Sequence, residues 1–190
     1  MILPDELQSK FQSLEGKTNF EKMLGTVGIL TVLLEEKMRP VIVGGLAVEI
    51  YTRSEYTTVD IDLILLNYDK AGEIFKSLGF KKQGRHWFHP ELLVSVEIPN
   101  FVLEDADPSR VVEIILPNDL KVLVIGIEDI ILDRLRACVH WKSTSDCEWA
   151  ERLYYLHQDR LDKHYLVTKS KEDLTFPVLE SILESINSIS

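Results

Sequence analysis

The sequence has few of the residues that would cross-link a small domain or hold a zinc ion. Its cysteines are Cys138 and Cys147, too few for a disulfide framework, and no Cys or His lies at zinc-site spacing from either. We therefore expect two small buried or half-buried thiols. This cysteine usage is typical of a cytoplasmic protein.

Long apolar segments are also missing. The longest apolar stretch near the N-terminus, Val27 to Leu34, is far below the roughly 20 residues that a bilayer-spanning helix needs. Charged side chains at Asp5, Glu6 and Lys10 interrupt the region where a signal peptide would be apolar. The sequence thus predicts neither a membrane span nor a signal peptide.

Basic residues are scarce relative to acidic ones. The 190 residues include 21 Lys and Arg against 31 Asp and Glu, so the net charge is −10. This excess argues against extended DNA or RNA binding over a broad face, because the summed field repels phosphate backbones. A hydrophobic fraction of 45% is ordinary for a globular protein, and the length fits one domain with a helical extension.

Hydrophobic spacing and turn residues predict a mixed α/β fold, a mixed sheet flanked by helices. The expected helices are one ending near Gly16, one from an Asn19 cap to Lys37, 46–51, 69–78 and several beyond 128. The expected strands are 41–43, 59–66, 87–88, 92–98, 111–116 and 121–125. We expect an α/β domain over 1–126, with N-terminal helices in 1–38, and a C-terminal helical region, 127–190, packed on that domain.

The clearest chemical signal is a pair of aspartates in the second expected strand. Because strand side chains alternate between faces, Asp60 and Asp62 share one face, about 6–7 Å apart at a rise of about 3.3 Å per residue. Two ionised carboxylates this close repel each other, and a divalent cation such as Mg²⁺ would relieve the repulsion. The alternative is that the pair marks the solvated face of an amphipathic strand.

Two further features lie near this pair in the expected fold. Gly44 and Gly45 separate a strand from a helix, where glycines let a phosphate approach the backbone and the helix N-terminus favours its charge; the alternative is a tight turn. Glu97 would complete a three-carboxylate cluster if its strand lies beside the aspartate strand, and otherwise would be an exposed strand residue. Glu113 competes for this role with the same alternation.

These segments together resemble a known family. The strings Val43-Gly44-Gly45-Leu46-Ala47-Val48 and Thr57-Thr58-Val59-Asp60-Ile61-Asp62-Leu63, followed by a strand carboxylate, are similar to the nucleotidyltransferase fold of the DNA polymerase β superfamily. Within it, the chain most resembles the bacterial AbiEii-like and other small nucleotidyltransferase-like proteins. The later segment 128–135 and the string Asp146-Cys147-Glu148-Trp149-Ala150 resemble the helical part of those proteins, so the resemblance covers about residues 38–160.

The resemblance implies a site and a reaction. Gly44 and Gly45 would lie under the triphosphate of an NTP, with Thr58 as a further nucleotide-binding residue. Independently of the resemblance, Arg53 lies between the glycines and the aspartates, where it would contact a phosphate; the alternative is a solvated arginine at a helix end. The metal-binding and catalytic carboxylates would be Asp60, Asp62 and Glu97, with Mg²⁺ or Mn²⁺ as cofactor. The protein would transfer a nucleoside monophosphate to a hydroxyl of an RNA, such as a tRNA end, or of a protein, and a toxin role with an antitoxin-like partner is consistent with this resemblance.

Two other functions stay open at this point. One is a binding or regulatory module that keeps the fold without turnover, and the other is an unrelated Mg²⁺-dependent phosphohydrolase that uses the same carboxylates. A local basic cluster, Lys81, Lys82, Arg85, His86 and His89, would dock RNA or another polyanion in a transferase. The alternative is a solvated hairpin whose charges keep an edge strand soluble.

Overall fold

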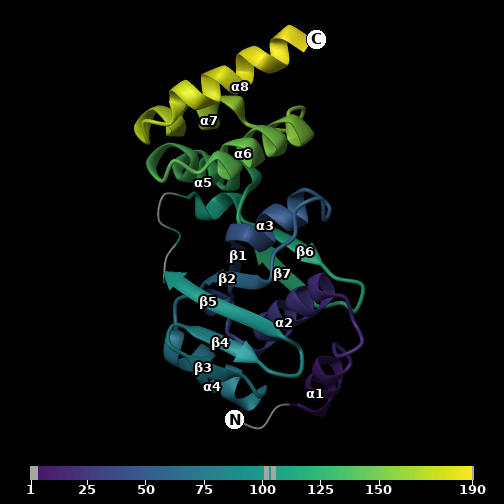
Figure 1. The fold of residues 1–190 in the computed structure, drawn as a ribbon. Coiled ribbons are helices and arrows are strands. Elements are labelled where there is room, and N and C mark those ends of the chain that lie inside the picture. The colour runs from purple at the N-terminus through teal and green to yellow at the C-terminus, as the bar shows by residue number, and fades with distance from the viewer. Residues whose placement is uncertain (1–3, 101–102, 104–105, 190) are drawn as a thin grey trace. The chain divides into compact units, whose positions relative to one another are not determined.

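The computed structural model describes residues 4–100, 103 and 106–189, and Figure 1 labels its main elements. The helices are α1 (Asp5–Gln12), α2 (Asn19–Leu33), α3 (Gly44–Tyr51), α4 (Tyr68–Ser77), α5 (Ile127–His140), α6 (Thr144–His157), α7 (Lys163–Glu172) and α8 (Phe176–Ile189). The strands are β1 (Val41–Val43), β2 (Asp60–Ile64), β3 (Lys81–Gln83), β4 (His86–His89), β5 (Val94–Asn100), β6 (Val112–Ile115) and β7 (Lys121–Val124). Short 3₁₀ helices lie at Glu36–Met38 and Pro108–Arg110. This is the mixed α/β architecture with a C-terminal helical extension that the sequence predicts.

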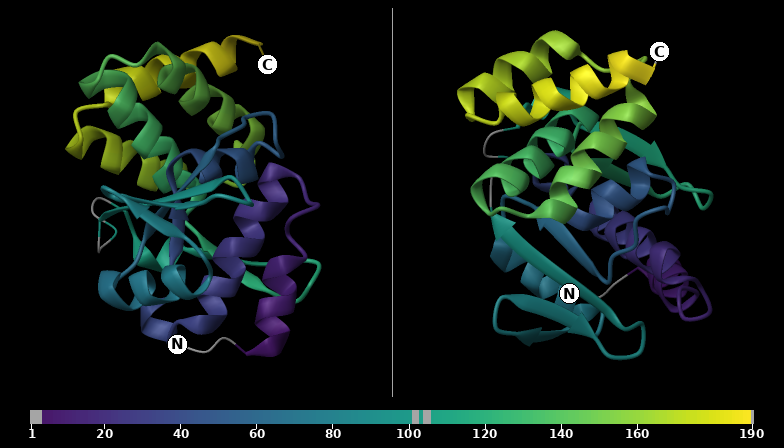
Figure 2. Two further views of the ribbon diagram at one scale, coloured as in Figure 1. Left: turned by 60° about the horizontal axis from the view of Figure 1, so that its bottom comes forward. Right: turned by 45° about the horizontal axis from the view of Figure 1, so that its top comes forward.

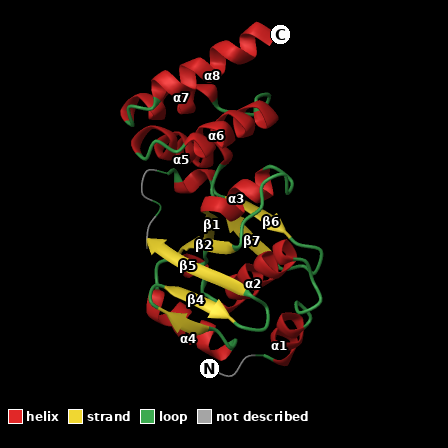
Figure 3. Cartoon of the chain, in the orientation of Figure 1, coloured by secondary structure: helices red, strands yellow, loops and turns green. Residues whose placement is uncertain are grey.

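The chain forms two compact units. The sheet unit comprises Met1–Ala47 and Thr57–Ile125, and the helical unit comprises Val48–Tyr56 and Gly126–Ser190. In the described part of the helical unit the secondary structure is entirely helical (Figure 3). The sequence predicts a continuous domain over 1–126, whereas the structure groups 48–56 with the C-terminal helices, so that α3 begins in one unit and ends in the other.

The strands of the described chain form one seven-stranded sheet with the order β3-β4-β5-β2-β1-β7-β6. Strand β2 is central and pairs in parallel with β5 and antiparallel with β1. Strand β1 also pairs in parallel with β7, while the β3–β4, β4–β5 and β6–β7 pairs are antiparallel. This order makes β2 and β5 neighbours and places β6 at the far edge.

One face of the sheet is covered by helices. In β2 the side chains of Ile61 and Leu63 are fully buried, while Asp60 and Asp62 on the other face are half-buried. Trp87 of β4 lies in the row of Ile61 and stacks on Phe75 of α4, with 5.4 Å between ring centroids. Helix α2 packs against β5, β7 and α4 (Figure 1). The two aspartates therefore lie on the sheet face opposite α2 and α4.

Helix α2 differs at both ends from the sequence-based prediction. Its cap is Thr18 rather than Asn19: the Thr18 hydroxyl accepts a hydrogen bond from the Glu21 backbone N–H, and the Glu21 carboxylate accepts one from the Thr18 N–H. This reciprocal capping box satisfies two of the first N–H groups. The helix ends at Leu33, and the residues expected to continue it form a 3₁₀ turn instead.

The β-rich segment follows the prediction with one addition. Strand β3 (Lys81–Gln83) was not predicted, because all its side chains are exposed and it carries no alternating apolar pattern. It pairs with β4 through a hairpin whose Gly84 has φ of 62°. The turn expected at 117–119 joins β6 to β7, with Asp119 at φ 64° and the Leu116 N–H donating to the Leu120 carbonyl at 2.8 Å.

Ion pairs and hydrogen bonds join the helices of the helical unit, which Figure 2 shows in two further views. Arg134 of α5 contacts Asp146 of α6 at 2.8 Å. The hydroxyl of Tyr165 in α7 donates to the buried Asp129 carboxylate of α5 at 2.7 Å. No helix of the described chain is both long enough and apolar enough to cross a bilayer.

The two cysteines are bonded to each other, so the expectation of two free thiols is wrong. Cys138 in the last turns of α5 and Cys147 in the first turn of α6 form a disulfide across a connection of three residues, with their Cα atoms 4.8 Å apart. The sequence separation of nine gave no indication of this pairing. Closing the helical hairpin brings the two positions together.

We expect the disulfide to contribute to the stability of the helical hairpin. Loop-closure entropy for a loop of this length predicts that the Cys138→Ala/Cys147→Ala variant loses about 2–3 kcal/mol of unfolding free energy. Urea unfolding with and without a thiol reductant measures the loss. Reductant should lower the stability of the wild type and leave the double variant unchanged; an insensitive wild type would contradict the prediction.

Candidate active site

The aspartate pair lies on the central strand of the sheet unit. Asp60 and Asp62 of β2 share one face, and both are half-buried between the fully buried Ile61 and Leu63. The alternation predicted from sequence is therefore present. A central strand is flanked by backbone on both sides, so these carboxylates are held by the main chain rather than by a mobile loop.

Gly44 allows the Asp62 carboxylate to approach the backbone at the start of α3. Strands β1 and β2 pair so that Val43 is opposite Asp62, and α3 begins at the next residue. Gly44 has φ of 58°, and a Cβ there would overlap Oδ2 of Asp62 and lie 3.0 Å from its Cγ. The negative carboxylate thus lies beside a helix N-terminus, where the helix dipole favours it. Gly45 is the second residue of the same helix.

Thr58 holds the other carboxylate. Its hydroxyl donates to Oδ1 of Asp60 at 2.9 Å, and its carbonyl accepts from the side-chain amide of Asn19 at 3.1 Å. The sequence predicts Thr58 as a nucleotide-binding residue, and that role is untested. The structure shows a positioning role, linking Asp60 to the start of α2.

Glu97 lies beside Asp62, in the position that a third carboxylate needs. Strands β5 and β2 run parallel with Glu97 opposite Asp62 and Ser95 opposite Asp60. The side chain of Glu97 is only 14% exposed, and each of its oxygens has a side-chain neighbour: Arg85 Nε lies 2.7 Å from Oε1, and His86 Nδ1 lies 3.6 Å from Oε2. These contacts orient the Glu97 carboxylate.

The competing carboxylate is far from this position. Glu113 is on β6, which β1 and β7 separate from β2, a distance of about 14 Å at about 4.8 Å between strands. Its carboxylate is exposed and paired with Lys121 at 2.7 Å. Of the two candidates, only Glu97 neighbours the aspartates.

Arg53 is not part of the sheet unit. It is an exposed residue just after α3, with φ of 52°, and belongs to the helical unit. Its contact with a nucleotide remains a prediction.

Asp60 and Asp62 fit a divalent cation as a pair of ligands better than as a three-carboxylate site with Glu97. Among the described residues no group of three or more His, Cys, Asp or Glu side chains is arranged to hold one metal ion, so a three-carboxylate centre remains a prediction. Mg²⁺ is commonly bound by one or two carboxylates together with water and substrate phosphates. The shared face of Asp60 and Asp62, and the missing Cβ at Gly44 beside Asp62, suit that mode of binding.

The basic cluster predicted from sequence is divided by the structure. Lys82 lies over the rings of Tyr68 and Trp87, 4.9 and 5.8 Å from their centroids, on the helix-covered face. Arg85 and His86 contact Glu97 on the opposite face. A single continuous patch over 81–89 is therefore wrong.

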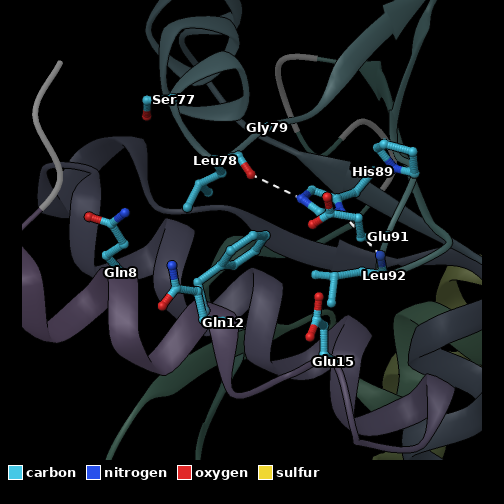
Figure 4. Close-up of a pocket in the computed structure, with 11 residues that line it drawn as sticks. Gln8, Gln12, Glu15, Ser77, Leu78, Gly79, His89, Glu91 and Leu92 are labelled. Carbon is cyan, nitrogen blue, oxygen red and sulfur yellow. Dashed lines mark hydrogen bonds between the residues drawn. The ribbon is translucent and has the colours of Figure 1, made fainter.

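His89 contributes no surface charge, because it is buried among backbone hydrogen-bond partners. The Leu92 N–H donates to Nδ1 at 3.1 Å, so the proton is on Nε2, which donates to the Leu78 carbonyl at 3.1 Å. Figure 4 shows this arrangement at the wall of a cavity of about 280 Å³ between α1 and the β4–β5 loop. Burial lowers the pKa of His89. The spacing of the histidines gave no sign of this role.

The folded state should lose stability in mild acid through His89. Because its folded pKa is below the unfolded value of about 6.5, the unfolded chain takes up a proton first as the pH falls. Its contribution is complete above pH 6.5 and declines below it. Urea unfolding between pH 7.5 and 5 should show a steeper decline for wild type than for His89→Gln; the comparison cancels His157, whose pKa burial also lowers. Equal slopes would contradict this role.

Substitution of Gly44 by alanine should cost more stability than the same substitution at Gly84, a glycine of similar backbone conformation. Gly84 has φ of 62° and no atom within 4 Å of the position that a Cβ would take, so Gly84→Ala should cost about 1–2 kcal/mol from the left-handed backbone alone. Gly44→Ala should cost more, because the methyl group must displace the Asp62 carboxylate. Chemical denaturation of both variants measures the difference, and equal losses would show that Asp62 moves aside freely.

Comparison with known proteins leaves the family open. No family model matches the sequence, and no curated protein is significantly similar to it. Among solved structures, the chain is similar to the solution structure of the antibiotic-resistance factor ANT(2″)-Ia, with 14% sequence identity over 96% of this chain and 94% of that chain and a TM-score of 0.48. A likeness at this level assigns neither a family nor a substrate to the chain.

Proposed function

We propose that this protein is a metal-dependent nucleotidyltransferase that moves a nucleoside monophosphate from an NTP to a hydroxyl group of an acceptor. The observation that carries the proposal is the placement of Asp62 against the start of α3 at Gly44, with Asp60 on the same strand face. A pair of carboxylates beside a glycine-initiated helix N-terminus combines a cation site with a phosphate site.

Each element of the site has a role in this reaction. The first N–H groups of α3, beside Gly44 and Gly45, would hold the NTP phosphates. Asp60 and Asp62 would hold Mg²⁺ or Mn²⁺, which supplies activation of the attacking hydroxyl and neutralisation of the leaving group. Thr58 keeps Asp60 in place through the 2.9 Å hydrogen bond.

Glu97 would serve as the proton acceptor. The acceptor hydroxyl oxygen forms a bond to the α-phosphorus, and the bond from that phosphorus to the β-phosphate oxygen breaks. Pyrophosphate leaves with the electron pair, and the hydroxyl proton passes to the Glu97 carboxylate. Arg85 and His86 support this role because their contacts fix the orientation of the carboxylate.

A second candidate function is a nucleotide-binding module without turnover. The observation in its favour is the same pair of contacts: each oxygen of Glu97 already has a side-chain partner, Arg85 at 2.7 Å and His86 at 3.6 Å. If these contacts persisted with substrate bound, Glu97 would be a poor base. Nucleotide binding through Asp60, Asp62 and α3 would remain.

Label transfer distinguishes the two functions. Wild type, incubated with each α-labelled NTP, Mg²⁺ or Mn²⁺ and total RNA or cell lysate, should transfer label to an acceptor. Asp60→Asn and Asp62→Asn should each reduce transfer by at least about 100-fold, because a bound cation contributes several kcal/mol to the transition state. Glu113→Gln, which removes a carboxylate from the far edge of the same sheet, should behave as wild type.

Three results would change the assignment. Nucleotide binding by wild type without transfer would favour the silent module. Release of free phosphate without transfer would indicate a phosphohydrolase. Full transfer by the two aspartate variants would contradict the proposed site.

A further inference from the structure

On the sheet face that bears Asp60 and Asp62, the side-chain charge changes from negative at the centre to positive at the β3–β4 edge. Register partners on adjacent strands lie on the same face, so the pairings define two rows across this face. The rows are Gln83, His86, Glu97, Asp62 and Val43, and Lys81, Phe88, Ser95 and Asp60. The centre of the face is therefore acidic, and its edge is basic.

Arg85 lies at this edge with most of its guanidinium available. It follows Gly84 in the two-residue loop between β3 and β4, and its side chain is 78% exposed. The ion pair with Glu97 uses Nε, at 2.7 Å. A guanidinium carries five N–H donors in a planar fork, so the two terminal amino groups extend from an anchored and well-exposed side chain. Such a planar group can donate two parallel hydrogen bonds to two oxygens of one phosphate.

The ion pair between Arg85 and Glu97 leaves most of the Arg85 side chain exposed. An ion pair with so exposed a partner contributes little to folding. The carboxylate that Arg85 contacts is the one that would accept the proton from the acceptor in the proposed function. An anion bound by Arg85 would thus lie next to the reacting hydroxyl.

We propose that Arg85 binds a phosphate group of the acceptor, so that the acceptor is an alcohol that carries a phosphate or phosphodiester close to its reactive hydroxyl. The inference rests on the proposed function and names its substrate class. Neighbouring strands are about 4.8 Å apart, so a phosphate at Arg85 and a hydroxyl at Glu97 would be separated by about one strand spacing, a few covalent bonds. Because the overall charge of −10 repels an anionic acceptor, a cation at this edge would favour its binding.

The transfer step itself is unchanged. The hydroxyl oxygen of the phosphate-bearing alcohol bonds to the α-phosphorus, pyrophosphate leaves, and the proton passes to Glu97. Arg85 forms only hydrogen bonds to the acceptor phosphate. Its removal should weaken acceptor binding, and it should also slow the chemical step because Arg85 orients Glu97.

Matched small acceptors test this inference. Glycerol and glycerol 3-phosphate differ only in the phosphate, and the dinucleoside monophosphate ApA carries a phosphodiester beside a ribose hydroxyl. Wild type should use at least one of the two phosphate-bearing acceptors and not glycerol. Arg85→Gln should raise the KM of that acceptor at least about tenfold, as expected from the loss of charge-assisted hydrogen bonds.

Lys81→Gln is the matched control. It removes the same charge from the same hairpin at an exposed position in the other row, and it should change the acceptor KM much less than Arg85→Gln. Arg85→Lys, which keeps the charge but not the planar fork, should restore part of the binding. Use of ApA alone would identify a nucleic-acid end, and use of glycerol 3-phosphate alone a small phosphorylated alcohol; both support the inference. Equal KM values for wild type and Arg85→Gln would overturn it.

A binding measurement separates this inference from the proposed function. The Arg85 Nε–H resonance, followed by NMR without NTP, should shift on titration with glycerol 3-phosphate or ApA and not with glycerol. A phosphate-dependent shift without transfer to any acceptor would support the anion site and contradict nucleotidyl transfer. The proposed function would stand, and the role of Arg85 would be overturned, if a phosphate-bearing acceptor were used without any shift of the Arg85 resonance and without any rise in its KM in Arg85→Gln.

Discussion

The close approach of the Asp62 carboxylate to the backbone at Gly44 is the constraint on which the site depends. Strand β1 ends at Val43, opposite Asp62, and the chain turns into α3 at once. Only a residue without a Cβ leaves room for the carboxylate there, and the left-handed φ of 58° gives a second reason for glycine. The strand, the helix N-terminus and the carboxylate consequently hold one another in position.

The rest of the candidate site is organised by cross-strand neighbours. Glu97 lies opposite Asp62 because β5 runs parallel to β2, and like charges so close would repel without compensation. Arg85 supplies that compensation from the loop between β3 and β4. The negative charge at the centre of the face is thus balanced by positive charge at its edge.

The sequence predicted the features that depend on local pattern. Alternation predicted the shared face of Asp60 and Asp62, and the turn residues 117–119 predicted the β6–β7 hairpin. Features that depend on distant partners were missed. Strand β3 has only exposed side chains and exists through its pairing with β4. The bond between Cys138 and Cys147 and the buried state of His89 likewise depend on tertiary packing, which single-residue spacing does not encode.

Helix α3 belongs to both units, and this limits how the chain can be divided. Its eight residues make a helix of about 12 Å, too short to be stable alone. Gly44 at its start belongs to the sheet unit, whereas Tyr51 at its end packs on His157, which also hydrogen-bonds the Tyr51 carbonyl at 2.9 Å. The two units are therefore interleaved along the polypeptide. A fragment that ends at residue 125 would contain all of α3 but lose His157, which packs on the C-terminal end of the helix. The sheet unit of this protein therefore cannot be excised with all of its native contacts.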